Sequence, residues 1–317
     1  MRTVELAGLT ASAEGLGCMG MSSVYGAADW DGSVATIRRA LDLDVTLIDT
    51  ADAYGAGHNE VLVGRAVAGR RDEALIATKA GMDFSTGRGK VVLRGTPDYL
   101  KRACDASLLR LGVDVIDLYY LHRVAPDVPL EESVGALAEL VEEGKVRRIG
   151  LSEVTGDQLR AAHRVHPVAA VQSEYSLWTR DPETGVAAAA RELGVALVAY
   201  SPLGRGFLTG TVDVTGLAAD DGRRRLPRFS EEAARGNAAI TEAVAEVARA
   251  KGVTAGQVAL AWVAAQSDRL GIPVVPIPGT KRVRWLEENA AALDVPLTEA
   301  DLDRLDGLAA GVVGGRY

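Results

Sequence analysis

The sequence predicts an α/β protein built as a single (β/α)8 barrel of the TIM type, and three observations support this fold class. Short runs rich in β-branched residues alternate with longer segments of helical period, which is the pattern of βαβ units around a parallel sheet. The predicted strands are continuously apolar, as is typical of strands that are covered on both faces. Eight such strands within 317 residues fit a closed barrel better than an open sheet.

The expected elements follow one another in the order that a barrel requires. The eight predicted strands cover residues 15–19, 45–49, 74–78, 115–121, 146–151, 168–172, 195–200 and 274–277. Helices are predicted between them at residues 33–43, 59–68, 97–111, 130–143, 156–166 and 182–193. Pro97 stands in the first turn of its helix, where its fixed φ is favourable, and glycines follow three helices, at Gly112, Gly144 and Gly194. Thr155 and Thr298 are predicted N-caps, the second with Asp301 three residues on.

No linker, low-complexity tract or break in composition divides the chain, so residues 1–317 are predicted to form one domain. Residues 203–236 stand apart within it, because they follow the seventh strand, are rich in Gly and Arg, and include the arginine run 223–225. A solvated surface loop would have this composition. The same composition suits an insertion that covers a phosphate-bearing cofactor, and this is the prediction we carry forward.

Composition and charge restrict the class of function. The chain has 35 Lys and Arg against 43 Asp and Glu, a net charge of −8, which argues against nucleic acid or a membrane surface as a partner. Cys18 and Cys104 are too few for a disulfide framework or a Cys-rich zinc site, and no metal site is predicted. The first residues lack an apolar stretch of signal-peptide length, and no run reaches the ~18 apolar residues of a spanning helix. A cytoplasmic enzyme for a small molecule is expected, and its oligomeric state is left open.

The segment 15–20 matches the dinucleotide fingerprint G-x-G-x-x-G. That motif binds a pyrophosphate only where it follows a strand and opens a helix. Here the glycines coincide with the first predicted strand, and the residues after them have the composition of a turn. We therefore interpret these glycines as part of the strand.

Four residues of matching chemistry fall at or just beyond the C-terminal ends of three neighbouring strands. Asp49 ends the second strand, with Tyr54 in the loop after it, while Lys79 and His122 follow the third and fourth strands. Active sites of (β/α)8 barrels are built at this rim. Taken singly, the four have structural explanations: a turn cap, a half-buried loop aromatic, a lysine reaching solvent and a satisfied rim histidine. Taken together, they are predicted to converge on one site.

These four side chains would form a device for proton transfer. A tyrosine hydroxyl has a pKa near ~10 in water, and a neighbouring ammonium stabilises its phenolate. A buried carboxylate keeps that ammonium charged and oriented. An imidazole N–H can hold a carbonyl oxygen beside the tyrosine hydroxyl. The set suits carbonyl reduction, in which oxygen gains negative charge and then a proton.

Eight segments carry a resemblance to a known family, at residues 15–22, 47–55, 77–81, 114–122, 144–152, 171–175, 199–206 and 276–281. On these segments the chain resembles the aldo-keto reductase superfamily over essentially its whole length. Residues 17–22 and 277–281 look most like the bacterial and plant branch that holds the pyridoxal and perakine reductase types. The resemblance implies an NADPH-dependent barrel enzyme that reduces aldehydes or ketones. It also implies Asp49, Tyr54, Lys79 and His122 as the catalytic tetrad, with Tyr54 as the acid.

The resemblance places the cofactor on the remaining strand ends. Ser152 and Gln172 would bond the nicotinamide amide, and Tyr200, which could also be a core residue, would stack on the ring. Backbone N–H groups and one cation would hold the diphosphate, over Ser201, Pro202, Leu203, Gly204, Arg205 and Gly206.

After the eighth strand, residues 278–282 open a helix, which is a natural phosphate site. Many animal reductases have a lysine where this chain has Gly279, so the 2′-phosphate is left to Thr280, Lys281, Arg282 or Arg284. Trp285 would either stack on the adenosine or pack the helix. The family contacts adenine at the positions of Glu288 and Asn289.

The substrate pocket is predicted only in outline, and other functions stay open. Residues near the rim suit an apolar carbonyl compound: Tyr25, Trp30, Met82, Phe84, Arg123 and Trp178. A barrel aldolase with a Schiff base on Lys79 is one alternative, although Asp49 would work against the neutral amine it needs. A redox-sensing subunit that binds NADPH with little turnover is another.

Overall fold

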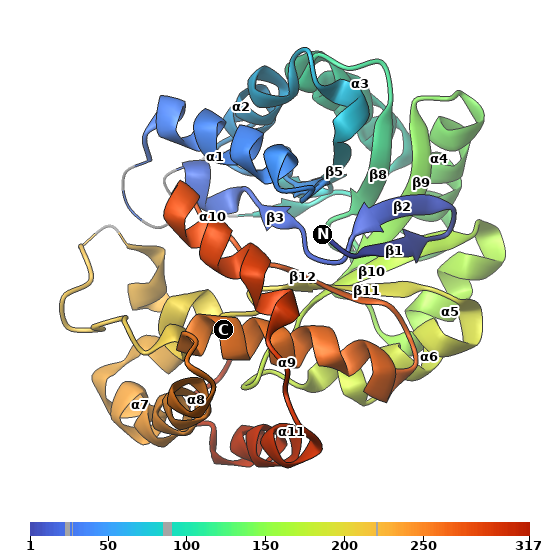
Figure 1. Ribbon diagram of the computed structural model, residues 1–317. Helices are drawn as coiled ribbons and strands as arrows, with labels where there is room; N and C mark the ends of the chain where they lie inside the picture. Colours follow the sequence, from blue (N-terminus) through green and yellow to red (C-terminus); the bar gives the residue numbers. More distant parts are fainter. Residues whose placement is uncertain (23–25, 27, 85–90, 220) are drawn as a thin grey trace.

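The computed structural model describes residues 1–22, 26, 28–84, 91–219 and 221–317. Its central sheet has eight parallel strands: β3 (Leu16–Gly17), β4 (Leu47–Asp49), β5 (Leu75–Ala80), β8 (Ile116–Leu121), β9 (Val146–Ser152), β10 (Val168–Glu174), β11 (Ala196–Tyr200) and β12 (Val274–Ile277). Gly15 N–H donates to Pro276 O over 2.9 Å, and Gly17 pairs with Gly279, so the edge strands β3 and β12 meet. The predicted (β/α)8 fold is confirmed (Figure 1).

Helices surround this sheet on the outside (Figure 1). The α-helices are α1 (Trp30–Asp42), α2 (His58–Val67), α3 (Pro97–Leu111), α4 (Leu130–Glu142), α5 (Gly156–Val165), α6 (Val186–Leu193), α7 (Glu231–Gly236), α8 (Ala238–Lys251), α9 (Ala255–Leu270), α10 (Val283–Ala290) and α11 (Glu299–Asp306). The short 3-10 turns are η1 (Met19–Ser22), η2 (Arg71–Glu73), η3 (Asp181–Glu183), η4 (Gly204–Thr209), η5 (Gly222–Arg225), η6 (Pro227–Phe229), η7 (Ala291–Asp294) and η8 (Gly307–Gly311). The predicted helix 182–193 is divided into η3 and α6, because Gly185 between them has φ +144°.

The sequence signals at helix ends are confirmed. Thr155 and Thr298 both form complete capping boxes, with Gln158 and Asp301. Gly112 and Gly194 end their helices in the left-handed conformation, at φ +64° and +68°. Within the part of the chain that is described, no helix combines the length and apolarity needed to cross a membrane.

The first predicted strand is shorter than expected. It keeps only two residues, because the 3-10 turn η1 begins at Met19. A Cβ added at Gly17 would lie 2.9 Å from Ile277 O, and one added at Gly15 would lie 2.8 Å from Leu47 O. These glycines therefore allow strands to approach closely where the barrel closes. Of the fingerprint glycines, Gly17 lies in the strand as expected, whereas Gly15 directly precedes it and Gly20 belongs to η1.

The bottom of the barrel is closed by a hairpin that the sequence analysis did not predict, β1 (Thr3–Leu6) and β2 (Leu9–Ser12). Its tight turn places Ala7 at φ +51° and Gly8 at φ +85°. Leu6 and Leu9 are buried in one cluster with barrel residues such as Leu118. With this end covered, the barrel is open to a ligand at the opposite, C-terminal rim.

Residues 203–236 contain η4, η5, η6 and α7 and so hold more structure than a solvated loop. Three aromatic rings join this region to the segment after β10. Trp178 stacks on Phe207 with ring centroids 4.9 Å apart, and Phe229 meets Trp178 edge-on at 6.3 Å. All three rings are buried, so they hold the region against the barrel. Two further short strands, β6 (Met82–Asp83) and β7 (Val92–Leu93), pair beside the rim.

We predict that Gly150→Ala destabilises the barrel by about 1–3 kcal/mol through overpacking. A Cβ at Gly150 would lie 2.4 Å from two ring carbons of Tyr120 and 3.0 Å from Ala170 O. The matched control is Gly135→Ala within α4, where a Cβ meets no atom within 4 Å. It should stabilise the protein by about 0.5–1 kcal/mol, because alanine is the better helix former. Denaturant midpoints measure both variants, and equal shifts would contradict the packing argument.

Candidate active site

A pocket of about 890 Å³ lies at the C-terminal ends of the strands. Three residues of the predicted tetrad, Asp49, Tyr54 and His122, line it. Of the described residues, no group of three His, Cys, Asp or Glu side chains is arranged to hold a metal ion. The polar groups that line the pocket come from the strand ends and from the loops that follow them.

Lys79 lies at the centre of the site and is fully buried. Its Nζ donates to Asp49 Oδ1 over 2.6 Å and to Thr50 O over 2.7 Å, and it lies 3.3 Å from Tyr54 Oη. The second oxygen of Asp49 accepts a hydrogen bond of 2.8 Å from Gln172 Nε2. The structure thus brings three tetrad residues into direct contact and ties Gln172 to them.

Strand register explains why these side chains meet. Asp49 pairs with Ala77 in β5, so Lys79 stands two residues further along, at the rim above it. Tyr54 follows in a turn, with its N–H bonded to Ala51 O. Asn59, which sequence reasoning missed, fixes this turn: it is fully buried, donates to Cys18 O, and accepts from Thr50 Oγ1.

The charge state of Lys79 is set by two opposing effects. Burial lowers the pKa of Lys79, but the charge of Asp49 and the contact with Tyr54 outweigh burial, so the pKa ends above its usual value. The ammonium is therefore charged at neutral pH. This arrangement works against a Schiff base, because the nucleophile would have to be the neutral amine.

Tyr54 and His122 face each other edge-on, with ring centroids 5.9 Å apart. Burial raises the pKa of Tyr54 more than Lys79 lowers it, so the net shift is upward, whereas the sequence argument considered only the lysine. Burial and the charges of Lys79 and Arg123 hold the pKa of His122 well below its usual value. At neutral pH the pocket thus has a protonated phenol beside a neutral imidazole, whose Nδ1 has no partner among the described residues.

Most of the predicted cofactor residues line the same pocket. They are Ser152, Gln172, Tyr200, Ser201, Pro202, Leu203, Arg205, Gly206, Gly279, Thr280, Lys281 and Arg282. The remaining three do not line it. Gly204 lies against Trp178, Glu288 accepts a hydrogen bond from Thr254 Oγ1, and Asn289 is buried in α10. Their roles stay predictions.

Of the residues predicted near the substrate, Met82, Phe84 and Arg123 line the pocket. Trp178 is buried beneath the 203–236 region, and Trp30 packs edge-on against His58, so neither does. Tyr25 lies outside the described residues. Arg123 Nη1 donates to His122 O over 2.6 Å and to Ser152 Oγ over 3.0 Å.

Cations gather at the end of the pocket formed by residues 279–282. Lys281 and Arg282 line it together with Arg223, which Asp221 holds through two hydrogen bonds of 3.0 and 2.7 Å. Burial and the charges of Arg282 and Arg223 lower the pKa of Lys281. An anion at this end would relieve the repulsion between these groups. Arg284 instead stacks on Trp285, 3.9 Å from its ring centroid.

Three charged or aromatic pocket residues were not singled out from the sequence, Glu153, Arg316 and Tyr317, whereas Arg223 belongs to the arginine run noted there. Glu153 directly follows Ser152 and has φ +55°, as Ser201 and Arg205 have φ +51° and +57°. Non-glycine residues in this conformation are strained, and such strain concentrates at functional sites. Only Glu153 had a sequence signal, its position one residue beyond a strand end.

The chain matches a known family over almost its whole length. A family model described as "Aldo/keto reductase family" matches residues 15–310. The "Aldo-keto reductase yakc [NADP(+)]" of Schizosaccharomyces pombe is 43% identical over 316 residues, which cover 97% of this chain and 92% of that protein.

Solved structures resemble the chain over nearly its whole length. The glycerol dehydrogenase AKR11B4 from Gluconobacter oxydans superposes with a TM-score of 0.88 at 29% identity, covering 99% of this chain and 97% of that one. An aldo/keto reductase from Klebsiella pneumoniae, solved in complex with NADP and acetate, gives a TM-score of 0.73 at 30% identity, covering 97% and 95%.

We predict that Asp49→Asn changes how stability depends on pH. Without the carboxylate, burial dominates and lowers the folded-state pKa of Lys79 below its unfolded value of about 10.4. Between those two values the unfolded chain binds more protons, so the free energy of unfolding rises with pH. In the wild type the folded-state pKa of Lys79 lies above its unfolded value. The ion pair therefore contributes fully to the free energy of unfolding at neutral pH, and this contribution is lost only as pH rises through the folded-state pKa. The free energy of unfolding of Asp49→Asn should be about 3–5 kcal/mol lower than that of the wild type near pH 7. Part of this difference should be regained towards pH 10.

The matched control for this measurement is Asp117→Asn. Asp117 is also buried, but it pairs with Arg71 over 2.6 Å, and an arginine does not titrate in this range. Asp117→Asn should therefore destabilise the protein without regaining stability towards pH 10. Denaturant midpoints across this range measure both variants. Parallel pH profiles for the two would show that Lys79 is not the group responsible.

Proposed function

We propose that this chain, which belongs to the aldo/keto reductase family, reduces an aldehyde or ketone to the alcohol with NADPH and with Tyr54 as proton donor. Two relatives support the cofactor: one is named for NADP(+), and another was solved with NADP. The observation that carries the proposal is the Tyr54 hydroxyl, 3.3 Å from the charged, buried Lys79 ammonium and facing the pocket.

The residues divide the chemistry among themselves. NADPH, when bound, supplies hydride to the carbonyl carbon, and the electron pair of the carbonyl bond moves to oxygen. Tyr54 gives that oxygen its proton, and Lys79 stabilises the phenolate that remains. Asp49 keeps Lys79 charged and oriented through its bond of 2.6 Å. His122, neutral and next to Tyr54, can direct an N–H to the carbonyl oxygen and fix its position.

The residues around the pocket fit a phosphorylated dinucleotide. Tyr200, Ser152 and Gln172 offer an aromatic face and amide-binding groups at the end near the tetrad. Lys281, Arg282 and Arg223 offer cations at the other end. Gly279 lines the pocket, and because it has no side chain its backbone can be approached closely by a ligand. A ligand with a ring at one end and phosphates at the other matches both sets.

The substrate side is apolar with one cation. Met82 and Phe84 line the pocket, and Phe84 is 44% exposed, so its ring is accessible to a ligand there. Arg123 is anchored by His122 O and Ser152 Oγ. These residues support an aldehyde or ketone with an apolar body as the substrate class.

The direct test is NADPH consumption by the purified protein with a panel of aldehydes, ketones and pyridoxal. Measurable oxidation of NADPH that depends on the carbonyl compound is expected. Tight NADPH binding with negligible turnover of every compound would instead favour a redox-sensing subunit.

We predict that Tyr54→Phe lowers turnover by roughly 10²–10⁴-fold while NADPH affinity stays unchanged, because only the proton donor is removed. Lys79→Met should be as damaging, and the double variant little worse, since residues that act as one unit are non-additive. Steady-state rates and cofactor titrations measure these effects. If the losses of the two single variants multiply in the double variant, Lys79 and Tyr54 do not act as one unit. If Tyr54→Phe keeps near-normal turnover, another group is the acid, and His122 is the next candidate.

We predict that NADPH binds about tenfold or more tightly than NADH, because cations near Thr280 can bond the 2′-phosphate. Lys281→Ala and Arg282→Ala should weaken NADPH and leave NADH nearly unchanged, and the difference should narrow as salt rises. The matched control is Lys251→Ala, which removes a lysine that pairs with Asp301 away from the pocket. Fluorescence titration measures the affinities. Equal affinities in the wild type, or parallel losses in the variants, would contradict the assignment.

A further inference from the structure

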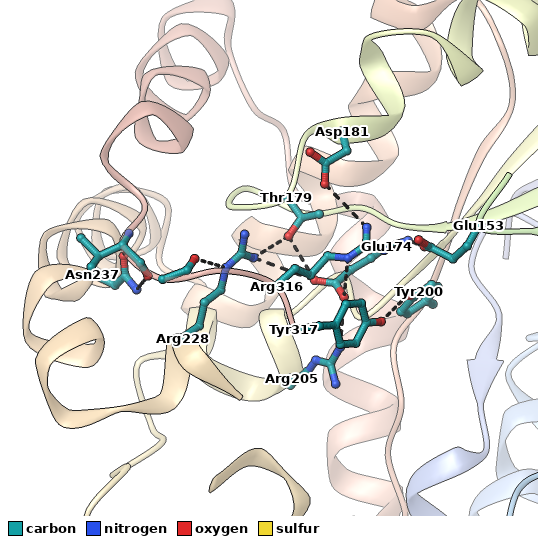
Figure 2. A network of polar contacts seen from close by, with 12 residues as sticks. Glu153, Glu174, Thr179, Asp181, Tyr200, Arg205, Arg228, Asn237, Arg316 and Tyr317 are labelled. Atoms are coloured by element: carbon teal, nitrogen blue, oxygen red, sulfur yellow. Dashed lines mark hydrogen bonds and ion pairs between the residues drawn. The ribbon is translucent and has the colours of Figure 1, made fainter. Parts of the chain in front are cut away.

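Residues 312–317 have no part in the chemistry proposed above, yet two of them enter the site. Arg316 and Tyr317 line the same pocket as Tyr54 and His122. The chain leaves η8 in an extended conformation at Val312 and runs along the 203–236 region to the rim of the barrel. We call these residues the 312–317 segment, and Figure 2 shows its contacts.

The backbone of the 312–317 segment is held in a defined path. Val313 donates its N–H to Asn237 Oδ1 over 2.8 Å, and its C=O accepts from Asn237 Nδ2 over 2.9 Å. Asn237 is fully buried, so its side chain is a fixed anchor for both bonds. Gly314 has φ +91°, which glycine adopts readily, and its C=O accepts from Arg228 Nε. The segment therefore reaches the pocket along a fixed course.

Arg316 provides the electrostatic anchor of the segment. Its guanidinium bonds Glu153 and lies 3.9 Å from Glu174 and 3.6 Å from Asp181 (Figure 2). Glu174 is buried and also pairs with Arg205 over 3.0 Å. Among the described residues, Arg316 is the cation that forms an ion pair with Glu153. Removing Arg316 would leave a partly buried carboxylate without its charge partner at the nicotinamide end of the pocket.

Tyr317 is placed by this anchor against Tyr200. The two hydroxyl oxygens lie 2.9 Å apart, and the Arg205 guanidinium lies 5.4 Å from the Tyr317 ring centroid (Figure 2). Burial raises the pKa of Tyr200, and Tyr317 raises it further, so Tyr200 carries a neutral hydroxyl at physiological pH. The bond fixes the far end of the Tyr200 ring, and β11 fixes its near end.

We propose that Tyr317 is a positioning residue for the cofactor: it holds the Tyr200 ring in the plane that stacks on nicotinamide. Arg316, through its ion pairs, keeps Tyr317 in this position. This inference rests on the proposed function, since it requires NADPH at Tyr200. The pocket has about 890 Å³ with Tyr317 in its wall, so the segment borders the space for the cofactor and leaves it open. For the nicotinamide end of the cofactor to leave the pocket past Tyr317, the 312–317 segment must move or its hydrogen bonds must break.

The rate of NADPH release tests the inference, measured by stopped-flow fluorescence on the full chain. Tyr317→Phe removes one hydrogen bond between neutral groups, so release should accelerate by about two- to tenfold. Arg316→Gln should accelerate release at least as much, and Arg316→Lys should restore part of the difference. Arg235→Gln is the matched control, because Arg235 is an exposed arginine of α7 whose partner Glu231 lies away from the pocket. It should release NADPH at the wild-type rate.

A double-mutant cycle separates positioning from general support of the fold. If Tyr317 acts through Tyr200, the effect of Tyr317→Phe disappears in a Tyr200→Phe background. Melting temperatures report any general loss of folding. Unchanged release in Tyr317→Phe and Arg316→Gln, or an effect that persists in the Tyr200→Phe background, would overturn the inference while the proposed function stands. Slower release in the variants would mean that the segment competes with the cofactor, and would also overturn it. A wild type that binds no NADPH would overturn both.

Discussion

The buried ion pair between Lys79 and Asp49 is the constraint on which the rest of the site depends. A charged ammonium inside a barrel is expensive unless every donor finds a partner. Here Asp49, Thr50 and Tyr54 surround Nζ within 3.3 Å, and Gln172 occupies the second carboxylate oxygen. Any slip in register between β4 and β5 would separate these partners. The chemistry and the correct pairing of the barrel strands are therefore secured by the same contacts.

The Lys79–Asp49 pair is shielded from water because the barrel is closed around its circumference and at the end opposite the C-terminal rim. Glycines at β3 let its backbone approach β12 and complete the circle. The β1–β2 hairpin covers the bottom, with Leu6 and Leu9 inside. Within the described part of the chain, the pocket approaches Lys79 from the rim, which Tyr54 and His122 line. The low dielectric behind them strengthens the pairing of charges at the rim.

Sequence reasoning was sufficient wherever a local signal determines the structure. Apolar runs gave the strands, capping residues gave the helix ends, and the rule that barrel sites lie at strand ends brought Asp49, Lys79 and His122 together. It failed where a contact depends on a path through space. Trp178 was expected near the substrate but is buried beneath η4. Arg316 contacts Glu153 across 163 residues of sequence, and no periodic pattern in the sequence predicts that contact. The net pKa shift of Tyr54 also escaped prediction, because burial is a property of the whole fold.

The two ends of the pocket use charge in different ways, and this separates binding from chemistry. Lys281, Arg282 and Arg223 form a cationic end whose partner would be a fixed anion, present before and throughout a reaction. Such contacts bind ground state and transition state alike and so contribute affinity. At the other end Lys79 is neutralised by Asp49 and also bonded to Thr50 O, and its third polar contact is the Tyr54 hydroxyl. In the proposed reaction that contact would become stronger only as the tyrosine loses its proton, so it would lower the barrier without tightening the initial complex. Tyr200 lies at the end near the tetrad, where its hydroxyl also contacts the Tyr317 hydroxyl, so a hydrogen bond adds to packing in orienting its ring.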